Sequence, residues 1–303
     1  MKRNWIRVTV VVLAGCLLYG CGTIEMKRNA PENSIGVVLK AINSPYWLDV
    51  ETGMEQAAVE LGIDLNLVYP SGEQEVREQK DLVDDMLNSD VDLLMVAPCD
   101  CYDTNWIADK AEDQGIVLLT VDDRAMDVNI PFIGSDNKLI GKLTAEYFNQ
   151  TLPEGSSIYV LLGPENQMSN IDRLWGIENG LDPSFHIQQV TYTELTEDNG
   201  YQAVKQAEEK IDGLFCQNVV ASSGAVAALE EKGWNAQVIT VDTGEDAYQV
   251  LKSGMIDAFL RQDGYEIGYN AIKIAAETLD SGELPEDTFF ESELITMDTQ
   301  EER

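Results

Sequence analysis

The sequence predicts an α/β protein of two lobes, each built on a parallel β-sheet covered by helices. Strand-like and helix-like segments alternate along most of the 303-residue chain. Several strand-like segments, such as residues 91–96 and 116–121, are almost entirely apolar, as expected for strands buried on both faces of a parallel sheet. About ten strands are too many for one twisted sheet, so two sheets are expected.

In the first half of the chain, strands are expected at residues 34–40, 64–69, 91–96 and 116–121. The spacing of apolar residues predicts helices at residues 46–61, 73–87 and 102–114. Gly62 and Gly115 directly follow the first and third of these helices and are typical stop signals. Leu65, Leu67 and Tyr69 fall at every second position, which favours a strand.

The same rhythm continues in the second half. Strands are expected at residues 157–162, 187–192, 213–216, 237–241 and 255–260. Helices are expected between them at residues 136–150, 169–181, 198–211, 224–232 and 245–252, and a last long helix at residues 265–279. Repeated strand–helix units with short connections imply parallel sheets covered by helices, and the crossovers between their strands are expected to be right-handed.

Composition excludes several functional classes. A formal net charge of -34 at pH 7 would repel phosphate backbones, so no nucleic-acid partner is expected. The single histidine, His186, argues against a multi-histidine metal site and a histidine-based catalytic triad. The glycine-rich loops that hold nucleotide phosphates are absent from the sequence. We therefore expect no catalytic residue, no metal and no cofactor.

The first segment has the features of a secretory signal. Three basic residues precede an uncharged apolar run over residues 8–20, which is shorter than the roughly 20 residues of a membrane-spanning helix. This pattern predicts a signal peptide over residues 1–20. Its end resembles a bacterial lipobox, with Cys21 as the favoured lipidated residue and Cys16 as the alternative. The polar residues 21–33 are then expected to tether the body to the outer face of the cell membrane.

Three cysteines remain, Cys99, Cys101 and Cys216. They are too few for a disulfide framework, and Cys-Asp-Cys lacks the second ligand pair of a zinc site. We expect small buried apolar side chains, with a free thiol near a cleft as the alternative.

In open α/β sheets, ligands bind beyond the carboxyl ends of the strands. The segments that follow the expected strands are rich in aromatic, acidic, amide and hydroxyl residues. These segments are residues 43–47, 97–103, 122–124, 163–170, 221–223, 242–245 and 261–263. Aromatic rings provide flat apolar contact for a sugar ring, and carboxylates accept strong hydrogen bonds from hydroxyl groups. The set is typical of a site for a small polar solute.

These segments resemble the sugar-binding branch of the type 1 periplasmic binding proteins over residues 35–296. The pieces that carry the resemblance are Asn43-Ser44-Pro45-Tyr46-Trp47, Val121-Asp122 with Arg124-Ala125, Phe132 to Asn137 with Gly141, Val241-Asp242, and Gln262 with Gly268. The resemblance implies two Rossmann-like lobes joined by a three-stranded hinge, with the ligand enclosed between them. It places residues 34–133 plus 263–290 in the N-terminal lobe and residues 134–262 plus 291–303 in the C-terminal lobe. The crossings are expected near residues 133–134, 261–262 and 289–292.

The resemblance also implies a binding site. Tyr46 and Trp47 match stacking positions, and Asp122 and Asp242 match ligand carboxylates, although either aspartate could instead cap a helix. The full expected ligand-binding set is Ser44, Tyr46, Trp47, Asp122, Asp123, Arg124, Asn170, Arg173, Ser222, Asp242 and Gln262. Asp136 is expected to cap the helix that follows it.

Three departures from the branch change the expected ligand. Ile171 replaces an arginine of the ligand shell, and Asp123 stands where relatives often have arginine. The alignment puts residues 221–223 in place of an amide–aspartate pair after the eighth strand. The pocket is therefore expected to be more acidic than a ribose site, which makes an amino sugar, another cationic solute or a different polyol conceivable.

The expected function is that of a monomeric, lipid-anchored, non-enzymatic binding protein. It would capture a small sugar or sugar-like ligand and deliver it to a membrane ABC importer. The alternative is a sensor of the same fold that presents its ligand to a membrane histidine kinase. A hydrolase is disfavoured because the sequence has no Gly-x-Ser-x-Gly motif and one histidine.

Overall fold

A computed structural model describes residues 33–42 and 44–301. The predicted signal peptide, Cys16, Cys21, most of the predicted tether and Asn43 lie outside the described residues. Among the residues that are described, no helix is both long and apolar enough to cross a membrane.

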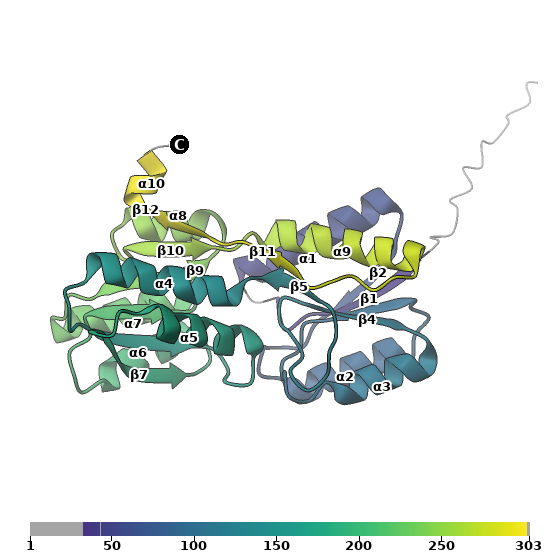
Figure 1. Cartoon of the computed structure of the whole chain (residues 1–303), viewed down its shortest axis with the longest axis horizontal. Coiled ribbons are helices and arrows are strands. Elements are labelled where there is room, and N and C mark those ends of the chain that lie inside the picture. Colours follow the sequence, from purple (N-terminus) through teal and green to yellow (C-terminus); the bar gives the residue numbers. More distant parts are fainter. Residues whose placement is uncertain (1–32, 43, 302–303) are drawn as a thin grey trace, which may run out of the picture. The chain divides into compact units, whose positions relative to one another are not determined.

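The described residues form two six-stranded sheets (Figure 1). The first has the order β11-β5-β4-β3-β1-β2 and consists of β1 (Ser34–Val38), β2 (Asp64–Val68), β3 (Leu93–Val96), β4 (Val117–Val121), β5 (Phe132–Ser135) and β11 (Thr288–Phe290). The second has the order β12-β10-β9-β8-β6-β7 and consists of β6 (Ser157–Leu162), β7 (His186–Tyr192), β8 (Gly213–Cys216), β9 (Gln237–Asp242), β10 (Ala258–Arg261) and β12 (Glu293–Thr296). Every described pairing is parallel except β10 with β12. The predicted α/β class with two parallel sheets is confirmed.

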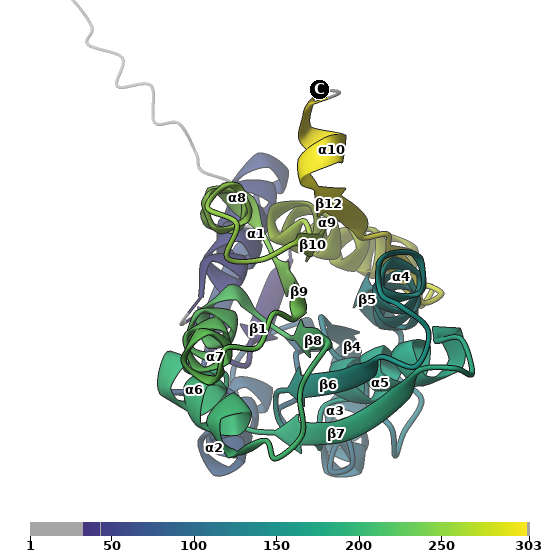
Figure 2. The ribbon, with the colours of Figure 1, turned by 90° about the vertical axis from the view of Figure 1, so that its left-hand side faces the viewer.

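Helices cover both faces of each sheet (Figures 1 and 2). The first sheet carries α1 (Pro45–Leu61) and α9 (Gly264–Ser281) on one face and α2 (Val76–Leu87) and α3 (Asn105–Gln114) on the other. The second carries α4 (Asn137–Thr151) and α5 (Met168–Gly180) on one face and α6 (Glu197–Gln206), α7 (Val219–Lys232) and α8 (Gly244–Lys252) on the other, and α10 (Met297–Glu301) follows β12. We call the first sheet with its four helices the N-terminal lobe, and the second with its helices the C-terminal lobe.

Burial on both faces explains the almost entirely apolar segments. Ile35 and Val37 of β1 pack under α1 and α9, whereas Val38 packs against α2 and α3 on the opposite face. Successive side chains of a strand point to opposite faces, so a strand covered on both sides needs apolar residues at every position.

The chain passes between the two sheets three times within the described residues: after β5, after β10 and after β11. β5 pairs with both β4 and β11 and stays in the first sheet through Ser135, so the first passage is at Asp136, slightly later than expected. The Asp136 carboxylate accepts a hydrogen bond from the Leu139 N–H at 2.9 Å, which confirms the predicted helix cap.

The largest differences from the predicted helix boundaries are in α6 and α7. α6 ends at Gln206, earlier than expected. α7 begins at Val219 rather than near Gly224, because the Asn218 side chain accepts a hydrogen bond from the Ala221 N–H at 2.8 Å and caps the helix. Residues 221–223 therefore lie inside α7, and the residues that follow β8 are Gln217 and Asn218.

Helices α1 and α9 approach each other closely through small residues. A Cβ atom added to Gly268 would lie 2.1 Å from the Val50 carbonyl oxygen, and one added to Gly53 would lie 2.2 Å from the Tyr265 carbonyl oxygen. Both distances are far shorter than a van der Waals contact, so the backbones of the two helices touch at glycine.

We expect Gly268→Ala to lower the free energy of unfolding by about 1–3 kcal/mol, because the added methyl group forces the two helices apart. Urea denaturation measures the change. Gly72→Ala is the control, since its nearest neighbour would be 3.9 Å from the added Cβ, and it should leave stability unchanged or slightly raised. Equal stabilities of the two variants would contradict the close packing of α1 and α9.

Candidate functional site

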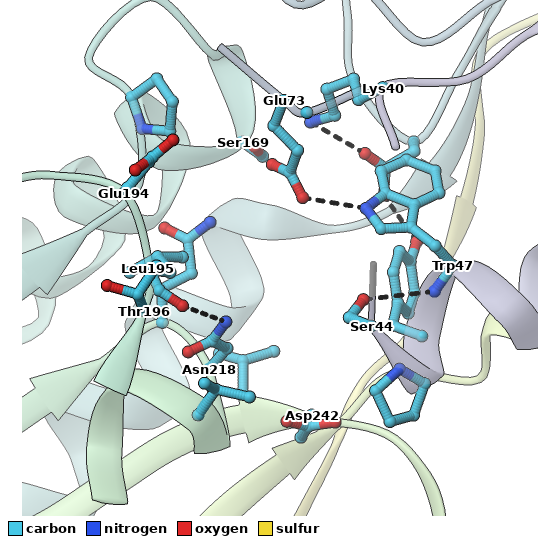
Figure 3. Close-up of a pocket in the computed structure, with 18 of the residues that line it drawn as sticks. Lys40, Ser44, Trp47, Glu73, Ser169, Glu194, Leu195, Thr196, Asn218 and Asp242 are labelled. Carbon is cyan, nitrogen blue, oxygen red and sulfur yellow. Dashed lines mark hydrogen bonds and ion pairs between the residues drawn. The ribbon is translucent and has the colours of Figure 1, made fainter. Parts of the chain in front are cut away.

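A cavity of about 380 Å³ lies where the carboxyl ends of strands from both sheets meet (Figure 3). Lys40 and Asp122 reach it from beyond β1 and β4, Asn218 from beyond β8, and Asp242 and Gln262 from the ends of β9 and β10. The volume lies at the lower end of the ~300–1,000 Å³ range of small-molecule sites. This is the place at which open parallel sheets bind ligands.

The first turn of α1 brings two aromatic side chains to the cavity. The Ser44 hydroxyl accepts a hydrogen bond from the Trp47 N–H at 3.5 Å, and Pro45 occupies the start of the helix, so the turn is set locally. Tyr46 and Trp47 then pack edge to face with ring centroids 5.3 Å apart. The Trp47 indole N–H donates to the Glu73 carboxylate at 2.9 Å.

Lys40 lies buried beside the cavity with an exposed fraction of 2%. Its Nζ is 3.1 Å from Asp122 Oδ2 and 3.1 Å from Asp123 Oδ2, and 5.7 Å from the Trp47 ring centroid. Burial alone would lower the pKa of Lys40, but the charges of Asp123 and Asp122 outweigh it and raise the pKa well above its usual value. The ammonium group therefore stays charged.

Asp122 adopts a left-handed backbone conformation with φ of 62°, and among the described non-glycine residues it is alone in having positive φ. The Asp123 N–H donates to the Val121 carbonyl at 2.6 Å, which is the bond of a γ-turn centred on Asp122. No helix begins at this point, so Asp122 does not cap one. Strained turns of this kind concentrate at functional sites.

Asp122 is also bonded to Tyr46. The Tyr46 hydroxyl donates to Asp122 Oδ1 at 2.6 Å. Burial and the nearby carboxylate raise the pKa of Tyr46 well above its usual value, so the phenol keeps its proton.

A second polar chain crosses the cavity floor. Arg173 donates to Asn137 Oδ1 at 2.8 Å and to Gln262 Oε1 at 3.1 Å. Gln262 in turn donates through Nε2 to the Ser135 hydroxyl at 2.7 Å. Burial lowers the pKa of Arg173, yet a guanidinium group keeps its proton in proteins, so the cavity retains this positive charge.

Asp242 ends β9 at the opposite side of the cavity from Glu73 in Figure 3. Its carboxylate accepts hydrogen bonds from the Val219 N–H at 3.1 Å and the Thr243 N–H at 2.8 Å. The capping position of α8 is Thr243, so Asp242 does not cap that helix, and its bond from Val219 reaches the first residue of α7 instead.

Seven of the eleven sequence-predicted site residues line the cavity: Ser44, Tyr46, Trp47, Asp122, Arg173, Asp242 and Gln262. The other four do not line it. Asp123 is buried behind Lys40, and Arg124 forms an ion pair with Asp172. Asn170 is fully buried and donates to the Pro164 carbonyl at 2.7 Å, and Ser222, inside α7, donates to the Asn218 carbonyl at 2.7 Å.

Sequence reasoning missed several polar residues that line the cavity, among them Lys40, Glu73, Glu194 and Asn218. The loops after β2 and β7, which carry Glu73 and Glu194, were not among the strand-end segments. Asn218 directly follows the correctly predicted strand 213–216, so an amide does stand at a position where none was expected.

The three described cysteines do not line the cavity, and they match the expectation of small buried side chains. Cys99, Cys101 and Cys216 are all free and fully buried. Burial raises the pKa of Cys99 and Cys101 to about 12 and of Cys216 to about 11, so these thiols are unreactive at neutral pH. In the described part of the chain, no three histidine, cysteine or acidic residues are grouped as a metal site.

Comparison with known proteins identifies a family match. Residues 35–284 match the family model described as a periplasmic binding protein domain. The chain is 23% identical to a ribose import binding protein of Bacillus subtilis, covering 89% of this chain and 90% of that protein. It is 25% identical to a D-ribose/D-allose-binding protein of Pseudomonas aeruginosa, covering 91% of this chain and 92% of that protein.

Solved structures agree with this fold. A Caulobacter myo-inositol binding protein bound to myo-inositol superposes with a TM-score of 0.81 at 21% identity, covering 89% of this chain and 95% of that one. A solute-binding protein of an Agrobacterium radiobacter carbohydrate transporter, in complex with D-arabinose, has the same TM-score at 22% identity, covering 89% and 96%.

We expect Lys40→Met to lower the free energy of unfolding at neutral pH by about 3–5 kcal/mol, because it leaves two buried carboxylates without their cation. Burial already raises the pKa of Asp123, and loss of Lys40 would raise it further in the folded state. The folded variant would then bind protons that the unfolded chain does not, so its deficit should shrink as pH falls. Urea denaturation at neutral and mildly acidic pH measures this trend.

Lys80→Met is the matched control, because Lys80 forms an ion pair with Asp103 on the exposed surface and such pairs contribute little. Adding Asp123→Asn to Lys40→Met should restore part of the lost stability. A deficit that does not change with pH would mean that packing of the lysine stem, and not its charge, stabilises the fold.

Proposed function

Because the chain belongs to the periplasmic binding proteins, we propose that it is an extracytoplasmic solute-binding protein. It captures a small polyhydroxylated ligand between its two lobes and delivers it to a membrane ABC importer. It performs no catalytic step and works as a monomer.

The observation that carries this proposal is the composition of the cavity wall. The N-terminal lobe contributes aromatic faces from Tyr46 and Trp47 and the Asp122 carboxylate, and the C-terminal lobe contributes Arg173 and Asp242. Apolar C–H faces of a sugar ring fit against aromatic rings, and its hydroxyl rim fits carboxylate acceptors and guanidinium donors. Similar proteins are named for ribose, allose or inositol, and one was solved in complex with D-arabinose; all four compounds combine these two kinds of surface.

We propose that eight residues bind the ligand. They are the seven predicted residues that line the cavity, together with Asn218: Ser44, Tyr46, Trp47, Asp122, Arg173, Asn218, Asp242 and Gln262. Gln262 lies in a passage between the lobes, and a side-chain amide both donates and accepts, which suits a pair of neighbouring hydroxyl groups. Since contacts come from both lobes, a bound ligand favours the arrangement in which the lobes are close. The sensor alternative is not favoured, because similar proteins such as those of Bacillus subtilis and Agrobacterium radiobacter are named as import or transport components.

Ligand binding is expected to raise the thermal unfolding midpoint of the full-length protein by several degrees for at least one pentose, hexose, amino sugar or polyol. A ligand at about 100 times its dissociation constant stabilises the folded state by roughly 2.7 kcal/mol. Differential scanning fluorimetry across the panel measures the shift.

Asp242→Asn tests whether the shift arises in the cavity. It should weaken binding about 10-fold to 100-fold, the usual effect of losing a charged hydrogen-bond acceptor. Asp90→Asn, a change of the same chemistry at an exposed position without a hydrogen bond among the described side chains, should leave binding intact. If no member of the panel raises the unfolding midpoint of the folded protein, the result would contradict the proposed function.

We further propose a lipid anchor at Cys21. Cys21→Ser is expected to move the protein from the membrane fraction to the soluble fraction of the cells that produce it, whereas Cys16→Ser should leave it membrane-bound. Fractionation followed by immunoblotting measures the distribution. Release by Cys16→Ser alone would reassign the anchor, and release by neither would argue against lipidation.

A further inference from the structure

The charged side chains at the cavity do not balance. They comprise five carboxylates and two cations: Glu73, Asp122, Asp123, Glu194 and Asp242 against Lys40 and Arg173, with Asp123 lying directly behind Lys40. Five against two leaves three negative charges in excess. Burial raises the pKa of Asp123, and if that group carried a proton the excess would still be two.

The two cations are already engaged with other groups. Lys40 lies between Asp122 and Asp123, at 3.1 Å from each. Arg173 donates to the side-chain oxygens of Asn137 and Gln262. Within the described residues, neither cation forms an ion pair with Glu73, so the charge of this carboxylate is not offset by a salt bridge.

Glu73 is the carboxylate best placed to receive a ligand cation. Its Oε1 accepts the Trp47 indole N–H at 2.9 Å, which fixes the group beside the aromatic wall. Its backbone carbonyl accepts from Gln167 Nε2 of the other lobe at 3.4 Å, which holds the loop at the cavity. In Figure 3 the Glu73 carboxylate points into the space between Trp47 and Asn218. No described donor bonds to Oε2.

A carboxylate next to an aromatic ring is a favourable site for an ammonium group. The ammonium gains a charge-assisted hydrogen bond from the carboxylate and electrostatic attraction from the indole ring. A neutral sugar would leave the excess negative charge unpaired in a partly desolvated cavity, and an acidic sugar would add to it.

We propose that the ligand is a hydroxylated primary amine, such as an amino sugar or an amino polyol, whose ammonium group binds Glu73 beside Trp47. Its hydroxyl groups then meet Asp242, Asn218 and Gln262 at the other side of the cavity. This inference rests on the proposed function and specifies the substrate class of the same site.

Paired ligands that differ only in the amine test the proposal. The pairs are D-glucosamine with D-glucose, D-galactosamine with D-galactose, and an amino-deoxy-inositol with myo-inositol, and N-acetyl-D-glucosamine serves as the uncharged analogue. Isothermal titration of the full-length protein should give at least one amine that binds about 10-fold or more tightly than its neutral partner. N-acetylation should remove this advantage, and added salt should weaken binding of the amine alone.

Glu73→Gln identifies the group responsible, since it keeps the shape and the bond from Trp47 but removes the charge. The amine should bind about 10-fold to 100-fold more weakly, with the affinity for a neutral partner unchanged. Glu75→Gln is the matched control, because Glu75 is exposed two residues away and makes no capping bond to α2. If Glu73→Gln weakens the binding of amine and neutral ligands equally, Glu73 does not bind the ammonium group and only positions Trp47.

The outcomes separate this inference from the function on which it rests. Neutral sugars that bind as well as, or better than, their amino partners would overturn the inference and leave the solute-binding function standing. Failure of every ligand, amine and neutral, to bind the folded protein would overturn both.

Discussion

The ammonium group of Lys40 is the interaction on which the site depends. Neighbouring side chains of an extended strand point to opposite faces, so Asp122 and Asp123 could not both reach one cation from a regular strand. The γ-turn at Asp122 redirects them, at a strain of about 1–3 kcal/mol, and both carboxylates then lie 3.1 Å from Nζ. Asp123 also accepts from the Ser169 N–H at 2.9 Å and hydroxyl at 3.1 Å. One ion cluster thus shapes the cavity wall and joins the two lobes.

The topology imposes a second constraint, because the polar floor of the cavity is made from the passages between the sheets. Ser135 ends β5 just before the first passage, and Gln262 lies in the second. The hydrogen bond between these two side chains ties the passages together, and Arg173 extends the chain into α5. A ligand that contacts Gln262 or Arg173 therefore acts directly on the segments that must rotate if the lobes move.

The sequence predicts the fold well because burial on both faces leaves an apolar signal in the central strands, such as β1, β3, β6 and β9. It predicts less of the site, for two physical reasons. The strands β5, β11 and β12 are only three or four residues long and lie at passages, so they show no periodicity. The partnership of Lys40 with Asp123 joins residues far apart in the sequence and depends on the backbone turn at Asp122, which composition and spacing do not encode. The sequence therefore predicts that Asp123 binds the ligand, whereas in the structure its carboxylate is buried and paired with Lys40.

Direct contacts between the lobes lie beyond the Lys40 cluster as well. The Cys101 N–H donates to the Asn166 carbonyl at 2.9 Å, and the Thr243 hydroxyl donates to the Asp49 carboxylate at 3.0 Å. These bonds stabilise the close arrangement of the lobes, so a ligand has to supply only the remaining difference in free energy between close and separated lobes. Each such bond therefore strengthens the apparent affinity for the ligand and slows its release. The proposed cycle of capture and delivery requires the lobes to separate again. Polar contacts suit that step better than an apolar seal, because water or a partner surface can replace each bond as the lobes separate.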